Sequence, residues 1–169
     1  TRCAIKNNHS RAALTDISLK GTVSGTRRNN FSLELDSVYA RLGKGSLHGV
    51  FSLNNLDEQN FRSRIEADLD LKEVKDFIQL DSISELKGGL ISDITISGSL
   101  KDFSDSTLRT LHIIEQGSFI FKDASLTFKN IPVQIDRIHG KAKWSESVSI
   151  DSLTLSINET EILADGTIS

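Results

Sequence analysis

Apolar and polar residues alternate strictly along much of this chain, and the alternation is clearest in FRSRIEADLDL, residues 61–71. Every odd position in this segment is apolar except Ser63, whereas the even positions, from Arg62 to Asp70, are all charged. Successive side chains of a β-strand point to opposite faces of a sheet. The segment therefore predicts a strand with one apolar face and one charged face.

The same period of two recurs along the rest of the chain. The further segments that carry it are residues 16–24, 31–36, 46–53, 94–100, 117–128, 131–144, 148–157 and 160–169. The chain contains a single Pro, which agrees with a strand-rich fold because strand interiors tolerate Pro poorly. We therefore expect a mainly β fold of about nine or ten antiparallel strands.

Two of these segments change phase midway. In residues 148–157 the apolar residues move from even to odd positions after Ile150, and in residues 131–144 they move from odd to even positions after Ile135. A bulge of one extra residue produces such a change and bends the strand. We therefore expect a strongly curved sheet that forms a groove or a taco-like channel, with closure into a sandwich as the alternative.

One helix is predicted over residues 70–79. Asp70 is placed as its N-cap and Glu73 follows three residues later, which is the capping-box pattern. Val74, Phe77 and Ile78 then share one helical face. The segment 102–116 fits a strand, a short helix or both, so we expect one or two short helices.

No Pro-rich or Gly/Ser-rich linker divides the chain, so residues 1–169 are interpreted as one domain. The absence of Met indicates a region excised from a longer protein. Cys3 is the single cysteine, which excludes an internal disulfide. No apolar run approaches the ~20 residues that a membrane-spanning helix needs.

The sequence offers little catalytic chemistry. The four His residues lack metal-ligand spacing, and no G-x-S-x-G motif is present. The glycine-rich segment 43–49 lacks the order of a phosphate-binding loop and predicts a hairpin turn instead. With a net charge of −3 and no stripe of basic and aromatic residues, nucleic-acid binding is not expected. These residues do not predict an enzyme, and they leave open only a metal site assembled from distant strands.

A series of motifs in residues 88–169 resembles the C-terminal region of AsmA-family proteins. GGLISDITISGSL is followed by GSFIFKDASL, NIPVQI, IHGK, IDSLTL and finally EILADGTI. Upstream, the segments GKGSLHGVFSLNN and FRSRIEADLDLKEVKDF also resemble segments of the family. The resemblance rests on strand patterns, not on catalytic signatures, and it extends over most of the chain.

The resemblance implies a specific function. AsmA-like proteins belong with the bridge-like lipid transfer proteins, which are anchored in the bacterial inner membrane by an N-terminal helix and extend through the periplasm. Their apolar groove is thought to pass phospholipids toward the outer membrane without catalytic residues, metals or cofactors. This chain would then be a periplasmic fragment of such a membrane-anchored protein, with phospholipid or another lipid as its ligand and with unidentified envelope proteins as partners.

Such a conduit requires a continuous apolar surface, and the apolar positions of the alternating segments are the candidates for its lining. The candidate lining residues are Phe31, Leu33, Leu35, Leu47, Phe51, Phe61, Ile65, Leu69, Ile94, Ile96, Leu100, Phe119 and Phe121. The alternative is a structural or adhesive β-sandwich at the cell envelope that buries the same residues and binds glycan or protein through its loops. Aromatic residues make up only 6% of the chain, which argues mildly against glycan binding.

Overall fold

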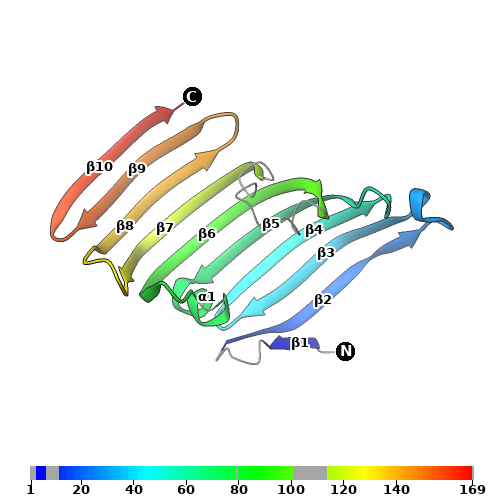
Figure 1. Ribbon diagram of the computed structural model, residues 1–169, viewed down its shortest axis with the longest axis horizontal. Coiled ribbons are helices and arrows are strands. Elements are labelled where there is room, and N and C mark those ends of the chain that lie inside the picture. The colour runs from blue at the N-terminus through cyan, green and yellow to red at the C-terminus, as the bar shows by residue number, and fades with distance from the viewer. Residues whose placement is uncertain (1–2, 7–11, 79, 101–113, 169) are drawn as a thin grey trace.

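A computed structural model describes residues 3–6, 12–78, 80–100 and 114–168 of the chain (Figure 1). All of its strands belong to one antiparallel sheet in which each strand pairs with the next along the chain. The strands are β1 (Cys3–Lys6), β2 (Ala13–Ser24), β3 (Ser32–Leu42), β4 (Gly45–Asn54), β5 (Asn60–Asp70), β6 (Ile83–Ser99), β7 (Ile114–Phe128), β8 (Gln134–Trp144), β9 (Val148–Ile157) and β10 (Thr160–Ile168). The nine strands from β2 to β10 have 9 to 17 residues, and the four-residue β1 lies at one edge. The mainly β prediction is confirmed.

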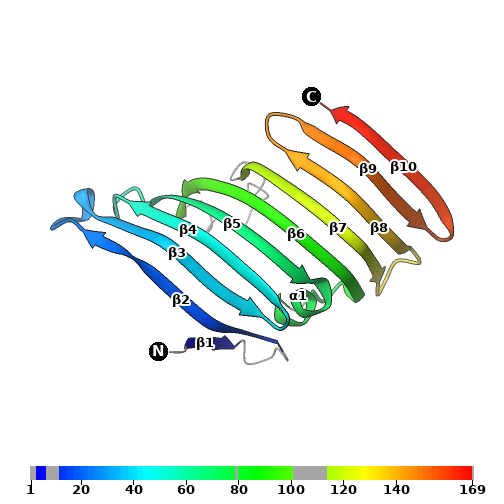
Figure 2. The ribbon, with the colours of Figure 1, turned by 180° about the vertical axis from the view of Figure 1, so that it is seen from behind.

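The sheet is open. Figures 1 and 2 show a twisted single layer with the two ends of the chain at opposite edges. The predictions of strong curvature and of closure into a taco or a sandwich are therefore wrong. The sheet stays open because of where the register shifts between its strands lie. The central ladders β4–β5 and β5–β6 pair without any register shift, so no line of bends crosses the middle of the sheet.

The bulges that the phase changes predicted are nevertheless present. In β9, Ile150 pairs with Gly166 and Leu153 with Ala164, so that Ser152 lies in an extra position with φ +53°. β8 likewise contains an extra residue between Ile135 and Ile138 relative to β7. Because of each extra residue, the apolar side chains that follow the bulge lie on the same face as those that precede it. The bulges thus preserve one apolar face instead of folding the sheet over.

The predicted helix is confirmed as α1 (Leu71–Ile78), which follows β5 directly and contacts β5 and β6. Residue 79, the last of the predicted range, lies outside the described residues. The side chain of Asp70 accepts a hydrogen bond from the backbone N–H of Lys72 at 2.9 Å, as an N-cap residue does. A single 3-10 turn, η1 (Arg28–Asn30), joins β2 to β3. Residues 102–113 of the ambiguous segment lie outside the described residues, and its last three residues begin β7. No described helix has the length and hydropathy needed to cross a membrane.

The core is small for a chain of this length. The buried apolar residues are Ala12, Ala40, Leu42, Phe61, Ala67, Leu71 and Ala124, and no large described side chain is less than 2% exposed. The accessible surface is 11386 Å², whereas a compact protein of 18.6 kDa exposes about 8,200 Å². The excess arises because a single sheet leaves both of its faces in contact with solvent.

Candidate functional site

One face of the sheet is apolar across nearly its whole width. Residues that pair across antiparallel strands place their side chains on the same face. The pairing therefore defines rows that cross the sheet at right angles to the strands. The longest row is Leu19, Val38, Gly49, Ile65, Ile94, Gly117, Trp144, Val148 and Ile168. It runs from β2 to β10 without a charged side chain.

Two further rows flank the longest row on the same face. One consists of Ala40, Leu47, Ala67, Ser92, Phe119, Ala142, Ile150 and Gly166. The other consists of Gly21, Leu35, Phe51, Ser63 and Ile96. We call the surface formed by these three rows the apolar face. Its only polar side chains, Ser63 and Ser92, are both buried, and Ser63 Oγ donates to the backbone carbonyl of Val50 at 2.8 Å.

The pairing brings most of the predicted lining residues together. Eleven of the thirteen lie on the side of the sheet that carries the apolar face, namely Leu33, Leu35, Leu47, Phe51, Phe61, Ile65, Leu69, Ile94, Ile96, Phe119 and Phe121. Phe31 precedes β3 and Leu100 follows β6, so both lie outside the strands. Phe51 and Phe61 stack with their ring centroids 6.4 Å apart.

The sequence reasoning missed the contribution of the C-terminal strands to this face. Trp144, Val148 and Ile150 join its rows, and Leu155 lies on the same side through its pairing with Ile138. The alternation of these residues was visible in the sequence. Their common face was not, because it depends on which strand of each pair carries the extra residue.

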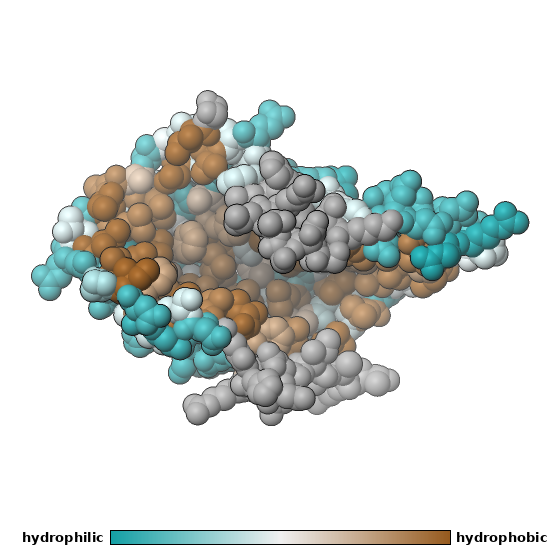
Figure 3. Space-filling view, viewed as in Figure 1, coloured by the Kyte–Doolittle hydropathy of each residue, from teal (hydrophilic) through white to brown (hydrophobic). Residues whose placement is uncertain are grey.

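Part of the apolar face is hollowed. A depression of about 320 Å³ over β2 to β5 is lined mainly by Leu19, Leu35, Val38, Ala40, Leu47, Phe51 and Ile65. Figure 3 shows apolar side chains gathered across this side of the molecule, with hydrophilic ones toward its rim. No second layer of strands covers the face in the described part of the chain. Its larger side chains, such as Ile65 and Ile94, are accordingly only half-buried.

The opposite face is polar and carries ion pairs between different strands. Arg64 on β5 donates two hydrogen bonds to Asp93 on β6, at 2.9 and 2.7 Å. These bonds lower the pKa of Asp93, although partial burial opposes the shift, and they raise the pKa of Arg64. Arg62 pairs with Glu115 on β7 at 3.0 Å. The polar face thus helps to stabilise the register of the central strands and keeps one side of the sheet hydrated.

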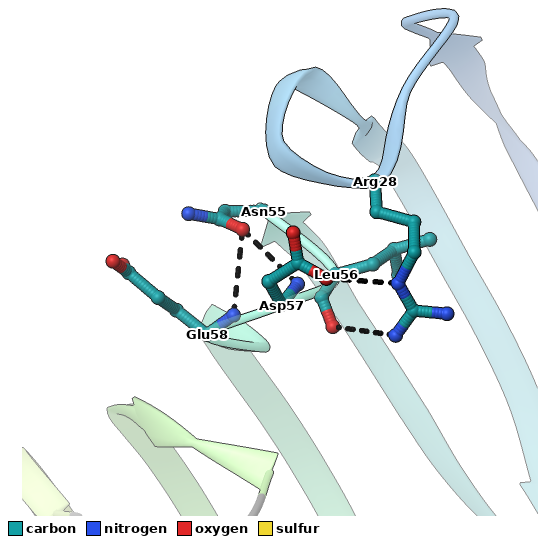
Figure 4. A network of polar contacts seen from close by, with 5 residues as sticks. All are labelled: Arg28, Asn55, Leu56, Asp57 and Glu58. Carbon is teal, nitrogen blue, oxygen red and sulfur yellow. Dashed lines mark hydrogen bonds and ion pairs between the residues drawn. The ribbon is translucent and has the colours of Figure 1, made fainter.

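A second polar network lies at the ends of the strands (Figure 4). Arg28 Nε in η1 donates to Asp57 Oδ1 at 2.8 Å, and its Nη2 donates to the carbonyl of Leu56 at 3.4 Å. The Asn55 side chain accepts hydrogen bonds from the backbone N–H groups of Asp57 and Glu58. These contacts link the β2–β3 connection to the β4–β5 turn, and we interpret them as structural.

Among the residues that the structure describes, no group of His, Cys, Asp and Glu side chains is arranged to hold a metal ion. Comparisons of the chain with models of protein families, with curated proteins and with solved structures find no match. The apolar face is therefore the feature of the described structure that most needs a functional explanation. A surface of this composition can hold aliphatic groups and exclude water from them.

Proposed function

We propose that this chain is a non-enzymatic segment of a periplasmic lipid conduit, with an apolar face that carries the acyl chains of phospholipids. One observation carries the proposal. The longest apolar row crosses the sheet from β2 to β10, two shorter rows flank it, none of the three contains a charged side chain, and in the described structure no other layer covers them. Monomeric soluble proteins rarely expose contiguous apolar patches beyond a few hundred Å².

The dimensions of the apolar face suit a long aliphatic ligand. Neighbouring strands lie about 4.8 Å apart, so the row that joins β2 to β10 spans about 38 Å. Each CH₂ group removed from water contributes about 0.8 kcal/mol, so that even a short contact between a lipid tail and the face is favourable. The lipid headgroup would remain in water at the rim.

The direction of the rows suggests the direction of movement. A lipid that slides along the long row, at right angles to the strands, meets Val38, Ile65 and Ile94 in succession with no buried charge to cross. Similar apolar contacts along the whole path would avoid a single deep site that traps the ligand. The row therefore suits transfer better than storage.

The location is proposed through the resemblance to the AsmA family. The motifs that carry the resemblance occupy β6 to β10, and they end in the EILADGTI segment of β10. Membership of that family would place the chain in the periplasm, within a protein anchored in the bacterial inner membrane, with envelope proteins as partners. The alternative of a closed adhesive β-sandwich is not proposed, because the described strands form a single open sheet.

Lipid uptake from vesicles tests this proposal. The purified chain is incubated with vesicles of phosphatidylethanolamine and phosphatidylglycerol, separated from them, and analysed for bound phospholipid by native mass spectrometry. We expect Ile65→Lys, which places a charge on the longest row, to reduce uptake at least about tenfold, because burying an unpaired ammonium is costly. Val50→Lys is the matched control, since Val50 lies on the polar face of the adjacent strand and is already exposed.

Two results would contradict the proposal. One is a wild-type chain that folds but takes up no phospholipid. The other is an equal loss of uptake in the Ile65→Lys and Val50→Lys variants, which would show that the apolar face is not the binding surface. Circular dichroism of each variant establishes that the sheet is intact before uptake is compared.

A further inference from the structure

The outer edge of β10 is unpaired in the described structure, and apart from the charged side chains of Glu161 and Asp165 it lacks the features that usually protect such an edge. The strand is nine residues long and contains neither Pro nor Lys. The register shift against β9 comes from Ser152 in β9, so β10 itself has no bulge. Ile162, Leu163 and Ile168 are 43%, 76% and 67% exposed. An edge of this kind is a template for pairing with another strand.

The opposite edge of the sheet has a matching free stretch. β1 pairs with β2 only as far as Ile17, so residues 18–24 of β2 have no outer partner among the described residues. Leu19 and Val23 lie on the apolar side there, and they are 59% and 67% exposed. The shift against β3 arises from an extra residue in β3, which leaves this stretch of β2 regular as well.

The charges of the two edges are complementary. On the polar face, β10 carries Glu161 and Asp165, and neither forms an ion pair with another described residue. The free stretch of β2 carries Lys20 on the same face, also without a described ion-pair partner. Two β10 strands pairing with each other would bring four carboxylates together. Pairing of β10 with β2 would instead bring acid beside base.

We propose that the β2 edge of a second copy of this chain adds to β10, so that the sheets of successive copies join side by side. β2 and β10 run in the same direction within one sheet, because the intervening strands alternate. A copy placed in the same orientation therefore forms a parallel pair. Several registers that differ by two residues align the apolar sides, and the one that also sets Lys20 beside Asp165 places Leu19 beside Ala164 and Val23 beside Ile168.

This joint would extend the apolar rows from one copy into the next. It is a head-to-tail contact that uses two different edges, so it does not close on itself and generates linear assemblies. Pairing of residues 18–23 with residues 163–168 is six residues long and makes a small interface, so the association is weak and concentration-dependent. The joint is argued from edge pairing and charge alone, independently of the proposed lipid function.

Sedimentation velocity without lipid, over a range of protein concentrations, tests the joint. The wild-type chain should shift toward larger species as concentration rises. Lys20→Glu and Asp165→Lys each replace an attractive pair by a repulsive one, and each should raise the apparent Kd about fivefold. The double variant restores the attraction and should associate like the wild type. A mixture of the two single variants should associate more strongly than either variant alone.

The variants also separate this arrangement from its competitors. If two β10 strands paired with each other, Asp165→Lys would change the association while Lys20→Glu would not. A chain that stays monomeric at all concentrations up to the millimolar range would overturn the proposal. Neither result touches the lipid-uptake assay, in which a monomer can still bind phospholipid, so the two proposals fail separately.

Discussion

At the scale of single residues, the sheet depends on glycine where β6 and β7 approach each other. Gly88 has φ +95°, and a Cβ added to it would lie 2.5 Å from both the Cα of Ala124 and the carbonyl oxygen of Asp123. Ala124 is itself 1% exposed, the lowest value among the buried residues. The backbone conformation and the lack of space therefore both require glycine at this position.

We expect Gly88→Ala to lower the free energy of unfolding by about 2 kcal/mol, since it combines backbone strain with a clash that neither backbone can easily relieve. Gly166→Ala is the control. Gly166 also has a positive φ, +145°, but no atom lies within 4 Å of an added Cβ. Urea denaturation should show the larger loss for the Gly88 variant, and equal losses would show that space beside Ala124 is not limiting.

The Arg64–Asp93 pair predicts a pH dependence of stability. Hydrogen bonds from Arg64 lower the pKa of Asp93 below its ordinary value. A lowered pKa in the folded state contributes stability that is present above the unfolded pKa of about 4 and is lost as the pH falls through the folded value. Asp93→Asn should therefore lower the stability of the fold slightly at neutral pH, and the stability of this variant should decrease less steeply below pH ~4 than that of the wild type.

The size of this effect is limited by solvent, because the Asp93 side chain is 42% exposed. Thermal unfolding measured at intervals from neutral to acidic pH provides the test. Asp68→Asn removes a carboxylate from the same face, at a position without an ion pair to another described residue, and controls for the change in net charge. If the unfolding temperature falls equally with decreasing pH in the wild type and in Asp93→Asn, the pair does not have this role.

At the scale of elements, the bulges decide which face each strand presents. Ser152 is the extra residue that keeps Leu153 on the same side of the sheet as Ile150. Deleting Ser152 should place Leu153, together with the apolar residues after it, on the polar face, because a slip of one residue reverses every side chain. We expect β9 and β10 to lose their regular pairing while the central strands persist.

Hydrogen–deuterium exchange resolved by peptide measures this outcome. Exchange should increase across residues 148–168 in the deletion variant and change little in β5 and β6. Ser152→Gly is the matched control, because glycine adopts the φ of +53° without strain and keeps the residue count. Unchanged exchange in β9 and β10 after the deletion would mean that the strands find another register without penalty.

These elements also show what the sequence could and could not predict. The strands and α1 were predictable because alternation, and the Asp70 cap that precedes α1, are local signals. The bulge at Ser152 was predicted from a change of phase. The extra residue in β3 was not predicted, although the apolar residues there also move from odd positions up to Leu35 to even positions from Val38. The expected curvature was wrong because a phase change records an insertion and not the direction of a bend.

At the scale of the whole molecule, the same limit applies to the candidate site. The N-terminal and central part of the apolar face followed from alternation, whereas Trp144 and Val148 joined it only through pairing across three strands. Their alternation alone was compatible with either side of the sheet. The result is a molecule in which most of the apolar strand residues share one side and many remain half exposed, with 11386 Å² of accessible surface in total.

This exposure predicts an unusual heat capacity. Unfolding a compact protein of 169 residues raises the heat capacity by about 2.0–2.5 kcal/mol/K, in proportion to the apolar surface that becomes exposed. The lipid-free chain already exposes much of that surface, so differential scanning calorimetry should give a clearly smaller increase. Adding phospholipid should raise the heat-capacity increase, because the folded complex then buries the apolar face.

A lipid-free chain with the full increase would show that the face is covered in solution, by a second copy or by another part of the chain. Ile65→Lys, which should fold but bind little lipid, should keep the small value whether or not phospholipid is added.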